Sequence, residues 1–215
     1  MGHLLLVRHS TTEASASGRN LGQGSDPSLT HEGEQLAALL GTRLEQELAE
    51  LPIADLRLVT SPAKRCRETL AQLVVAIGAD GADRDVEVDP RLLEIDYGAW
   101  EGLTADECWA RDPELRSAWE RDPFVTRTPD GESGRDVAAR AFPAFDALEE
   151  WLAENLARGV LVVGHNHVNR LRLTAMLGWP MSSYRSRVSQ DPAGYSIIGV
   201  RAGERIVRRL NVRPR

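Results

Sequence analysis

Short runs of strand-forming residues alternate along this chain with longer segments in which apolar residues recur at helical spacing. The clearest runs span residues 4–7, 56–60 and 160–163. Such alternation is typical of βα units around a parallel sheet. With 215 residues, 42% of them hydrophobic, the chain can also bury a sizeable core. We therefore expect one domain over residues 1–215, a three-layer α/β/α sandwich with a mostly parallel sheet.

Start signals accompany two of the helical segments. Thr30 can cap a helix that carries one apolar stripe and should cover a face of the sheet. The stripe consists of Leu36, Leu39, Leu40, Leu44 and Leu48. After the second strand, Ser61 offers a capping hydroxyl and Pro62 suits the first helical position. This dipeptide predicts a helix that begins at Pro62.

Prolines divide the middle of the chain. Because residues 104–130 contain three X-Pro steps, helices there should be short, and we expect an insertion on top of the sheet. Its aromatic side chains either line a pocket or pack the insertion onto the body. They are Trp109, Trp119 and Phe124. Beyond it, Ser133 and Asp136 form a capping signal for a helix in which Pro143 makes a kink or marks a late start.

The C-terminal segment favours an antiparallel hairpin at a sheet edge. Residues 195–200 and 205–210 are strand-like and are joined through Ala202-Gly203. From residue 201 to 215 the chain carries six arginines against one acid. We interpret this composition as a solvated edge strand, with binding of an acidic partner or a polyanionic substrate as the alternative.

Charge and composition limit the kinds of partner. The formal net charge of −6 provides no global attraction to nucleic acid or to an anionic membrane. The apolar run 4–7 is too short for a signal peptide or a spanning helix, so we expect a soluble, cytoplasmic protein. Cys66 and Cys108 lack disulfide or zinc-finger spacing and should be small buried residues. The oligomeric state stays open, with a homodimer as one option.

Polar residues gather where three predicted strands end. They are Arg8 and His9, the segment 61–65, and the segment 164–166. The carboxyl ends of parallel strands line the ligand crevice of an open α/β sheet, so these residues should converge. Arginine and histidine side chains suit a tetrahedral dianion such as a phosphoryl group. The amino-terminal dipole of the helix at Pro62 would add to that binding.

We expect no metal and no cofactor. The sequence has neither a Walker-type glycine loop nor an acidic metal cluster, so side chains alone must handle a phosphoryl group, as a histidine nucleophile can do. His165 and His167 could form a metal pair, but alternation at a strand end would point their rings apart. A phosphate ester of a small molecule is therefore the expected partner.

Five ordered motifs make the chain similar to a known family. They are residues 4–12 (LLLVRHSTT), 61–65 (SPAKR), 93–102 (LEIDYGAWEG), 130–133 (DGES) and 163–165 (VGH). In this order and spacing they resemble the histidine phosphatase superfamily, whose fold is phosphoglycerate mutase-like. The resemblance spans nearly the whole chain, and it implies a role for each matched residue.

By this resemblance, His9 would be the nucleophile that becomes phosphohistidine, and Glu94 the proton donor and later the base. The transferring phosphoryl group would be bound by Arg8, Arg65 and His165. His9 must be neutral to attack, and a backbone carbonyl that accepts its other N–H would fix the required tautomer. A partly dry environment can raise the pKa of Glu94 toward neutrality.

Departures from the family pattern mark the predicted substrate-binding residues. Ser10 and Ser15 stand where the family usually has glycine and asparagine, and a shorter phosphate contact is expected from Ser15. Gln23 lies in the loop 18–30, which by the resemblance gates the site. Asn166 stands where many members have glycine, and its amide could touch phosphate.

The predicted function is a metal-independent phosphomonoesterase acting on a small phosphorylated metabolite. One alternative is a phosphoglycerate mutase, whose known members have a longer, more basic insertion between the positions of Glu94 and Glu132. A second alternative is an inactive scaffold domain that binds a phosphorylated ligand. The retained catalytic motifs argue against this alternative. Candidate substrates are sugar phosphates, phosphoglycerate derivatives and the α-ribazole ester. Trp100, Trp109 and Phe124 hint at an apolar wall of the site.

Overall fold

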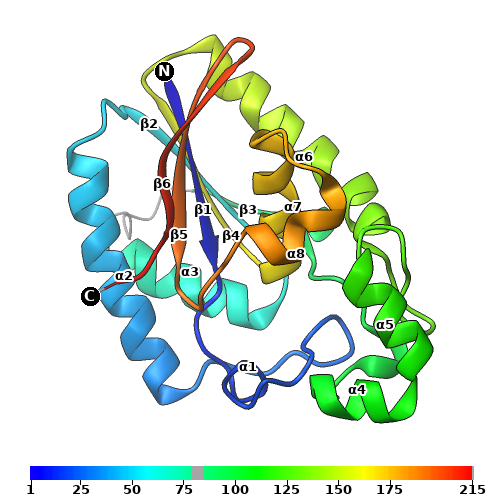
Figure 1. The fold of residues 1–215 in the computed structure, drawn as a ribbon. Coiled ribbons are helices and arrows are strands. Elements are labelled where there is room, and N and C mark those ends of the chain that lie inside the picture. Colours follow the sequence, from blue (N-terminus) through cyan, green and yellow to red (C-terminus); the bar gives the residue numbers. More distant parts are fainter. Residues whose placement is uncertain (79–84, 215) are drawn as a thin grey trace.

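A six-stranded mixed sheet forms the centre of the computed structural model, which describes residues 1–78 and 85–214 (Figure 1). The strand order is β3-β2-β4-β1-β5-β6. In chain order the strands are β1 (Gly2–Arg8), β2 (Asp55–Thr60), β3 (Val86–Val88), β4 (Arg158–Gly164), β5 (Tyr195–Arg201) and β6 (Glu204–Val212). All the runs that the sequence analysis identified as strands therefore form strands.

The strand directions confirm a mostly parallel sheet. Strands β1 to β4 run parallel to one another, whereas β5 pairs antiparallel with both β1 and β6. The β5–β6 hairpin turns at Ala202-Gly203, where Gly203 has a φ of +74°, a left-handed conformation that glycine adopts without a steric cost. β6 is thus the edge strand, paired antiparallel with its neighbour as predicted, and β5 inside the sheet is the strand that runs opposite to the other five.

Helices cover both faces of the sheet (Figure 1). The α-helices are α1 (Glu13–Ala16), α2 (His31–Ala49), α3 (Lys64–Ala76), α4 (Ala105–Arg111), α5 (Pro113–Arg121), α6 (Gly134–Glu154), α7 (Asn166–Met176) and α8 (Tyr184–Arg187). The 3-10 helices are η1 (Pro90–Leu92), η2 (Gly98–Trp100) and η3 (Met181–Ser183). Because α2 and α3 pack on one face and α6 and α7 on the other, the predicted three-layer sandwich is confirmed.

Two apolar cores lie on the two faces of the sheet. Successive side chains of a strand point to opposite faces, so Leu5 of β1 joins the core under α2 and α3 while Leu6 joins the core under α6 and α7. Cys66 lies in the first core and Cys108 in the second, and both thiols are free and buried, as predicted. No helix in the described part of the chain is long and apolar enough to cross a membrane.

The segment 104–130 forms the two short helices α4 and α5, as its prolines predict. Trp119 of α5 is only 1% exposed and packs into the core with α6 and α7, whereas Trp109 is 42% exposed. Phe124 is partly buried against the same core. Of the two roles weighed for these aromatic residues, Trp119 and Phe124 therefore fulfil the packing role.

One predicted helix start is wrong and another is confirmed. Helix α3 begins at Lys64 and not at Pro62. The Lys64 N–H donates to both carboxylate oxygens of Asp26, at 2.8 and 2.9 Å. A carboxylate from a distant loop thus occupies the amino end of α3, which the sequence analysis had expected to help bind the phosphoryl group. Helix α6 begins after Ser133, as the capping signal predicts, and it is continuous through Pro143, which excludes the alternative of a late start there.

Three arginines of the C-terminal segment form ion pairs with acids of the body. The pairs are Arg205 with Glu149 at 2.7 Å, Arg209 with Glu47 at 3.2 Å and Arg213 with Asp191 at 2.7 Å. Most residues of β6 are exposed at the sheet edge. Since intramolecular acids already neutralise these guanidinium groups, the observed contacts favour the solvated edge strand over a site for an acidic partner.

We expect Gly33→Ala to destabilise the fold where α2 meets the loop after β1. An added Cβ would overlap the Thr11 carbonyl oxygen, a backbone atom that cannot swing away. The free energy of unfolding in urea should fall by about 1–3 kcal/mol. Thr42→Ala on the exposed side of the same helix should change it by less than about 0.5 kcal/mol. A Gly33→Ala protein as stable as the parent would contradict this packing.

Candidate active site

The ends of three parallel strands meet at one edge of the sheet. Arg8 lies opposite Gly164 in the β1–β4 register, and the next N–H, that of His9, donates to the Gly164 carbonyl at 2.9 Å. The His9 and His165 rings are consequently neighbours, with centroids 5.3 Å apart in an edge-on arrangement. Ser61 joins them from the end of β2, its hydroxyl 2.8 Å from His165 Nε2. The structure thus brings together the residues that the sequence predicts to converge.

A backbone hydrogen bond fixes the tautomer of His9. Its Nδ1 lies 2.7 Å from the Ser10 carbonyl oxygen. A carbonyl only accepts, so Nδ1 carries the proton and Nε2 keeps its lone pair. Ser10 is itself held from two sides, because its N–H donates to Thr69 Oγ1 at 2.9 Å and its hydroxyl to the Gly33 carbonyl at 2.7 Å. The serine that departs from the family pattern therefore braces the histidine.

Both histidines of the site are held neutral. Burial, together with the charges of Arg8 and Arg65, lowers the pKa of His9 well below its ordinary value. Burial and the charge of Arg65 likewise lower the pKa of His165, which has no exposed surface. Desolvation and nearby cations both disfavour the imidazolium form. His9 is therefore a neutral imidazole whose Nε2 carries a lone pair.

His165 and His167 do point apart, although for a different reason from the one predicted. His165 caps α7 and faces Ser61, whereas His167 lies inside the first turn of that helix. The two nitrogens of His167 are each 2.8 Å from a phenol oxygen, that of Tyr97 or that of Tyr184. Among residues 1–78 and 85–214, no three His, Cys, Asp or Glu side chains are grouped so that they could hold a metal ion.

Two arginines flank the histidine pair. Arg65 is 1% exposed, and its Nη2 donates to the Gly22 carbonyl at 2.8 Å. Arg8 donates through Nη1 to the Gln190 carbonyl at 2.6 Å. The Nε atoms of both arginines are buried and have no partner within the described residues. Unmet donors on buried cations require an explanation, and an anionic ligand between these arginines and His9 would provide one.

Glu94 is a buried carboxyl group beside this cluster. It is 3% exposed, and burial raises its pKa, although backbone N–H groups and nearby arginines oppose the shift. Its Oε1 accepts the N–H of Ile95 at 2.9 Å, and its Oε2 accepts the N–H of His167 at 3.1 Å. A carboxyl group whose pKa is raised in this way keeps its proton at a pH at which an exposed carboxyl group has already lost it.

Arg140 is a positioning residue that the sequence analysis missed. From α6 it forms a two-pronged ion pair with Glu132, with both contacts at 2.8 Å. It also donates to the carbonyl oxygens of Arg91, Leu93 and Glu94 at 2.7 to 2.8 Å. The loop that carries Glu94 is thereby fixed to α6. No local motif marks Arg140, because its role depends on contacts between distant segments.

A cavity of about 250 Å³ opens beside His9 and Glu94. Two of the predicted substrate-binding residues, Ser15 and Asn166, line it. The Ser15 hydroxyl is already engaged, however, since it accepts the Thr12 N–H at 2.9 Å in the cap of α1. Gln23 lines a neighbouring hollow instead, and its amide donates to the Glu94 carbonyl at 2.8 Å. In this structure Gln23 therefore positions Glu94 and does not border the cavity.

The wall of this cavity is cationic and not apolar. Trp100 is fully buried in the core, and none of the three aromatic side chains of the predicted apolar wall borders the cavity. Besides Arg8, the wall contains Arg19, Arg116 and Arg185. The expectation failed because Trp100 and Phe124 pack at the core, and Trp109 is exposed away from the cavity.

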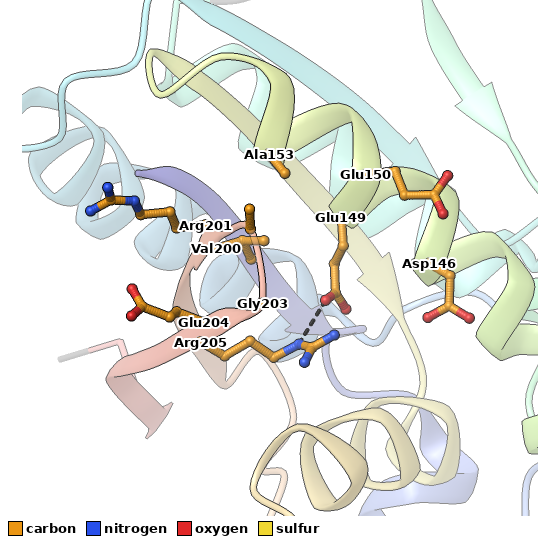
Figure 2. A pocket seen from close by; sticks show the side chains of 10 residues that line it. Asp146, Glu149, Glu150, Ala153, Val200, Arg201, Gly203, Glu204 and Arg205 are labelled. Atoms are coloured by element: carbon orange, nitrogen blue, oxygen red, sulfur yellow. Dashed lines mark hydrogen bonds and ion pairs between the residues drawn. The ribbon is translucent and has the colours of Figure 1, made fainter.

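A second hollow, of about 310 Å³, lies at the opposite end of the sheet (Figure 2). It is bordered by α6 and by the turn between β5 and β6. Glu149 points into it, but this carboxylate accepts from Arg205 at 2.7 Å and also pairs with Arg172. The carboxylate of Glu149 is thus already paired with two arginines and is not available to a ligand. We therefore identify the cavity beside His9 as the candidate active site.

The arrangement defines an α/β protein suited to binding a tetrahedral anion between histidines and arginines. A comparison with families agrees: the profile of the histidine phosphatase superfamily (branch 1) matches residues 4–213. The chain belongs to this superfamily, as the five motifs indicate.

Relatives cover the same length. Phosphoserine phosphatase 1 of Hydrogenobacter thermophilus is 30% identical over 212 residues, which are 99% of this chain and 93% of that protein. An acid phosphatase of Mycobacterium tuberculosis is 33% identical over 204 residues, 94% of this chain and 88% of that protein. The solved structure of Bacillus stearothermophilus YhfR superposes with a TM-score of 0.80 at 30% identity, covering 97% of this chain and 96% of that one. The fold and the family are thus shared over nearly the whole chain.

Proposed function

We propose that this protein is a metal-independent phosphomonoesterase that hydrolyses a small phosphorylated metabolite through a phosphohistidine at His9. The observation that carries this proposal is the state of His9, a buried neutral imidazole whose Nδ1–H is held by the Ser10 carbonyl at 2.7 Å. This leaves Nε2 as the nucleophile, and a neutral imidazole nitrogen is the form that attacks phosphorus. Membership of the histidine phosphatase superfamily supports the proposal.

In the first step, Nε2 of His9 attacks the phosphorus atom of the ester. The N–P bond forms while the bond between phosphorus and the ester oxygen breaks, and the electron pair of that bond leaves on the alkoxide. The protonated carboxyl group of Glu94 donates its proton to this oxygen, so that the product departs as an alcohol. Burial raises the pKa of Glu94, which keeps the proton available for this step.

In the second step, water attacks the phosphohistidine. Glu94, now a carboxylate, takes a proton from the water while the new O–P bond forms. The N–P bond breaks, its electron pair returns to Nε2, and inorganic phosphate leaves. His9 is again neutral and Glu94 again protonated, so the enzyme is restored without a net change.

Positive charge around the phosphoryl oxygens supplies the electrostatic part of the catalysis. Arg8, Arg65 and His165 surround His9, and fixed donors in a water-poor site stabilise developing charge more than solvent does. Asn166 at the start of α7 would add an amide contact. We extend the proposal to a cytoplasmic location, since two free buried thiols are typical of proteins from a reducing compartment.

We expect the protein to release phosphate from p-nitrophenyl phosphate at the same rate with and without a chelator. His9→Ala should reduce this release to background, because no nucleophile remains to form the N–P bond. Activity lost on chelation, or retained in His9→Ala, would contradict the proposal. With 3-phosphoglycerate the product should be inorganic phosphate, and formation of 2-phosphoglycerate would indicate the alternative mutase.

Glu94→Gln should lower kcat/KM, which reports the first step, by about 10²–10⁴ for alkyl phosphates, the usual contribution of general acid catalysis. The loss should be much smaller for p-nitrophenyl phosphate, whose leaving group is a weak base and needs no proton. Because the pKa of Glu94 is raised, its acid form persists above the ordinary carboxyl range, and kcat/KM falls only as pH rises through that raised pKa. This falling limb should be absent in Glu94→Gln. An equal loss for both esters would refute the role of Glu94.

A further inference from the structure

Two arginines of the cavity wall have no role in the phosphoryl transfer proposed above. Arg116 of α5 and Arg185 of α8 border the same cavity as His9 and Glu94. Both guanidinium groups share one carboxylate, that of Glu120, whose Oε1 pairs with Arg116 and whose Oε2 accepts from Arg185 at 3.0 Å. Two cations against one anion leave a positive charge at this part of the wall.

Both guanidinium groups are fixed against the indole of Trp119. The Arg185 guanidinium carbon lies 4.1 Å from the Trp119 ring centroid and that of Arg116 lies 4.7 Å away. Arg116 also lies 5.6 Å from the Trp100 ring. Trp119 is itself 1% exposed, so the support for the cations is rigid. Stacking on an aromatic face holds a guanidinium in place before a ligand arrives, which lowers the entropic cost of binding.

These two arginines also retain unmet hydrogen-bond capacity. The Nε atoms of Arg116 and Arg185 are buried, and neither has a hydrogen-bond partner in the part of the chain that the structure describes. The Arg116 side chain is only 5% exposed and that of Arg185 is 27% exposed. Bulk water therefore satisfies Arg116 poorly. An anionic ligand gains the most binding free energy from a buried cation that still has a hydrogen-bond donor without a partner.

The other charges at the cavity do not cancel this excess. Arg19 is neutralised by Glu107 at 2.9 Å, whereas Arg8 donates to a carbonyl and is available for the phosphoryl group. Glu94 must be protonated for the first step, so it contributes no negative charge then. The pKa of His167 is lowered by burial and then by Arg185 among other arginines, so that ring stays neutral and does not change the charge at the cavity.

We propose that the alcohol part of the substrate carries a second anionic group, a carboxylate or a phosphate, that Arg116 and Arg185 bind. The inference rests on the proposed phosphatase function and narrows its substrate class to phosphorylated acids or bisphosphates, as opposed to uncharged sugar monophosphates. The cavity volume of about 250 Å³ suits a metabolite of this size. Arg116 and Arg185 then act as specificity-determining residues, since a pair of cations that shares one carboxylate keeps an excess positive charge and discriminates against a ligand without a matching anion.

A matched pair of esters tests this assignment. 3-Phosphoglycerate and glycerol 3-phosphate share the phosphorylated carbon and the adjacent hydroxyl, and they differ in a carboxylate against a hydroxymethyl group. If the second anion is a carboxylate, we expect kcat/KM for 3-phosphoglycerate to be at least about tenfold higher than for glycerol 3-phosphate. If it is a phosphate, we expect the same excess for propane-1,3-diol bisphosphate over glycerol 3-phosphate. Turnover of all three esters with equal kcat/KM would overturn this inference and leave the proposed phosphatase function standing. No turnover of any phosphate ester would instead overturn the proposed function.

Two variants on α8 then locate the preference. Arg185→Gln should reduce the kcat/KM ratio between the favoured anionic ester and glycerol 3-phosphate by about tenfold, whereas Arg187→Gln should leave that ratio unchanged. Arg187 is a suitable control because it makes the same charge change on the same helix, is exposed, and lies outside the cavity against Trp179. The ratio is independent of any general loss of activity. A ratio that Arg185→Gln leaves intact would contradict the assignment.

Discussion

The parallel pairing of β1 with β4 is the constraint on which the whole site depends. Arg8 lies opposite Gly164, so His9 and His165 leave the sheet side by side, with ring centroids 5.3 Å apart. Both strands are buried on both faces, and a slip of one residue would turn each side chain to the opposite face. The apolar cores therefore fix the register, and the register places His9 beside His165.

Much of this arrangement could be predicted because the signals for it are local. The strand runs are short and mostly apolar, and Thr30 and Ser133 are the N-caps of α2 and α6, as their spacing indicates. Convergence of the strand ends follows from a general property of parallel sheets and needs no knowledge of side chains. The family resemblance added the roles of His9 and Glu94, which neither periodicity nor composition contains.

The remaining features could not be predicted because they depend on contacts between distant segments. Asp26 accepts the Lys64 N–H at the start of α3, a contact between residues 38 positions apart. Arg140 holds the Glu94 loop from another helix, 46 positions away. The cationic wall has the same origin, since Arg185 meets Glu120 only when α8 packs beside α5. Such side-chain pairs follow from packing geometry, which a single sequence does not reveal.

The most direct test of the account is the identity of the phosphorylated atom during turnover. The enzyme would be mixed rapidly with a ³²P-labelled ester and denatured in alkali, in which phosphohistidine survives, and the labelled peptide mapped. Since the Nδ1–H of His9 donates to the Ser10 carbonyl at 2.7 Å, we expect the phosphoryl group on Nε2 of His9. A phosphoryl group on Nδ1 of His9, or on any other residue, would contradict it.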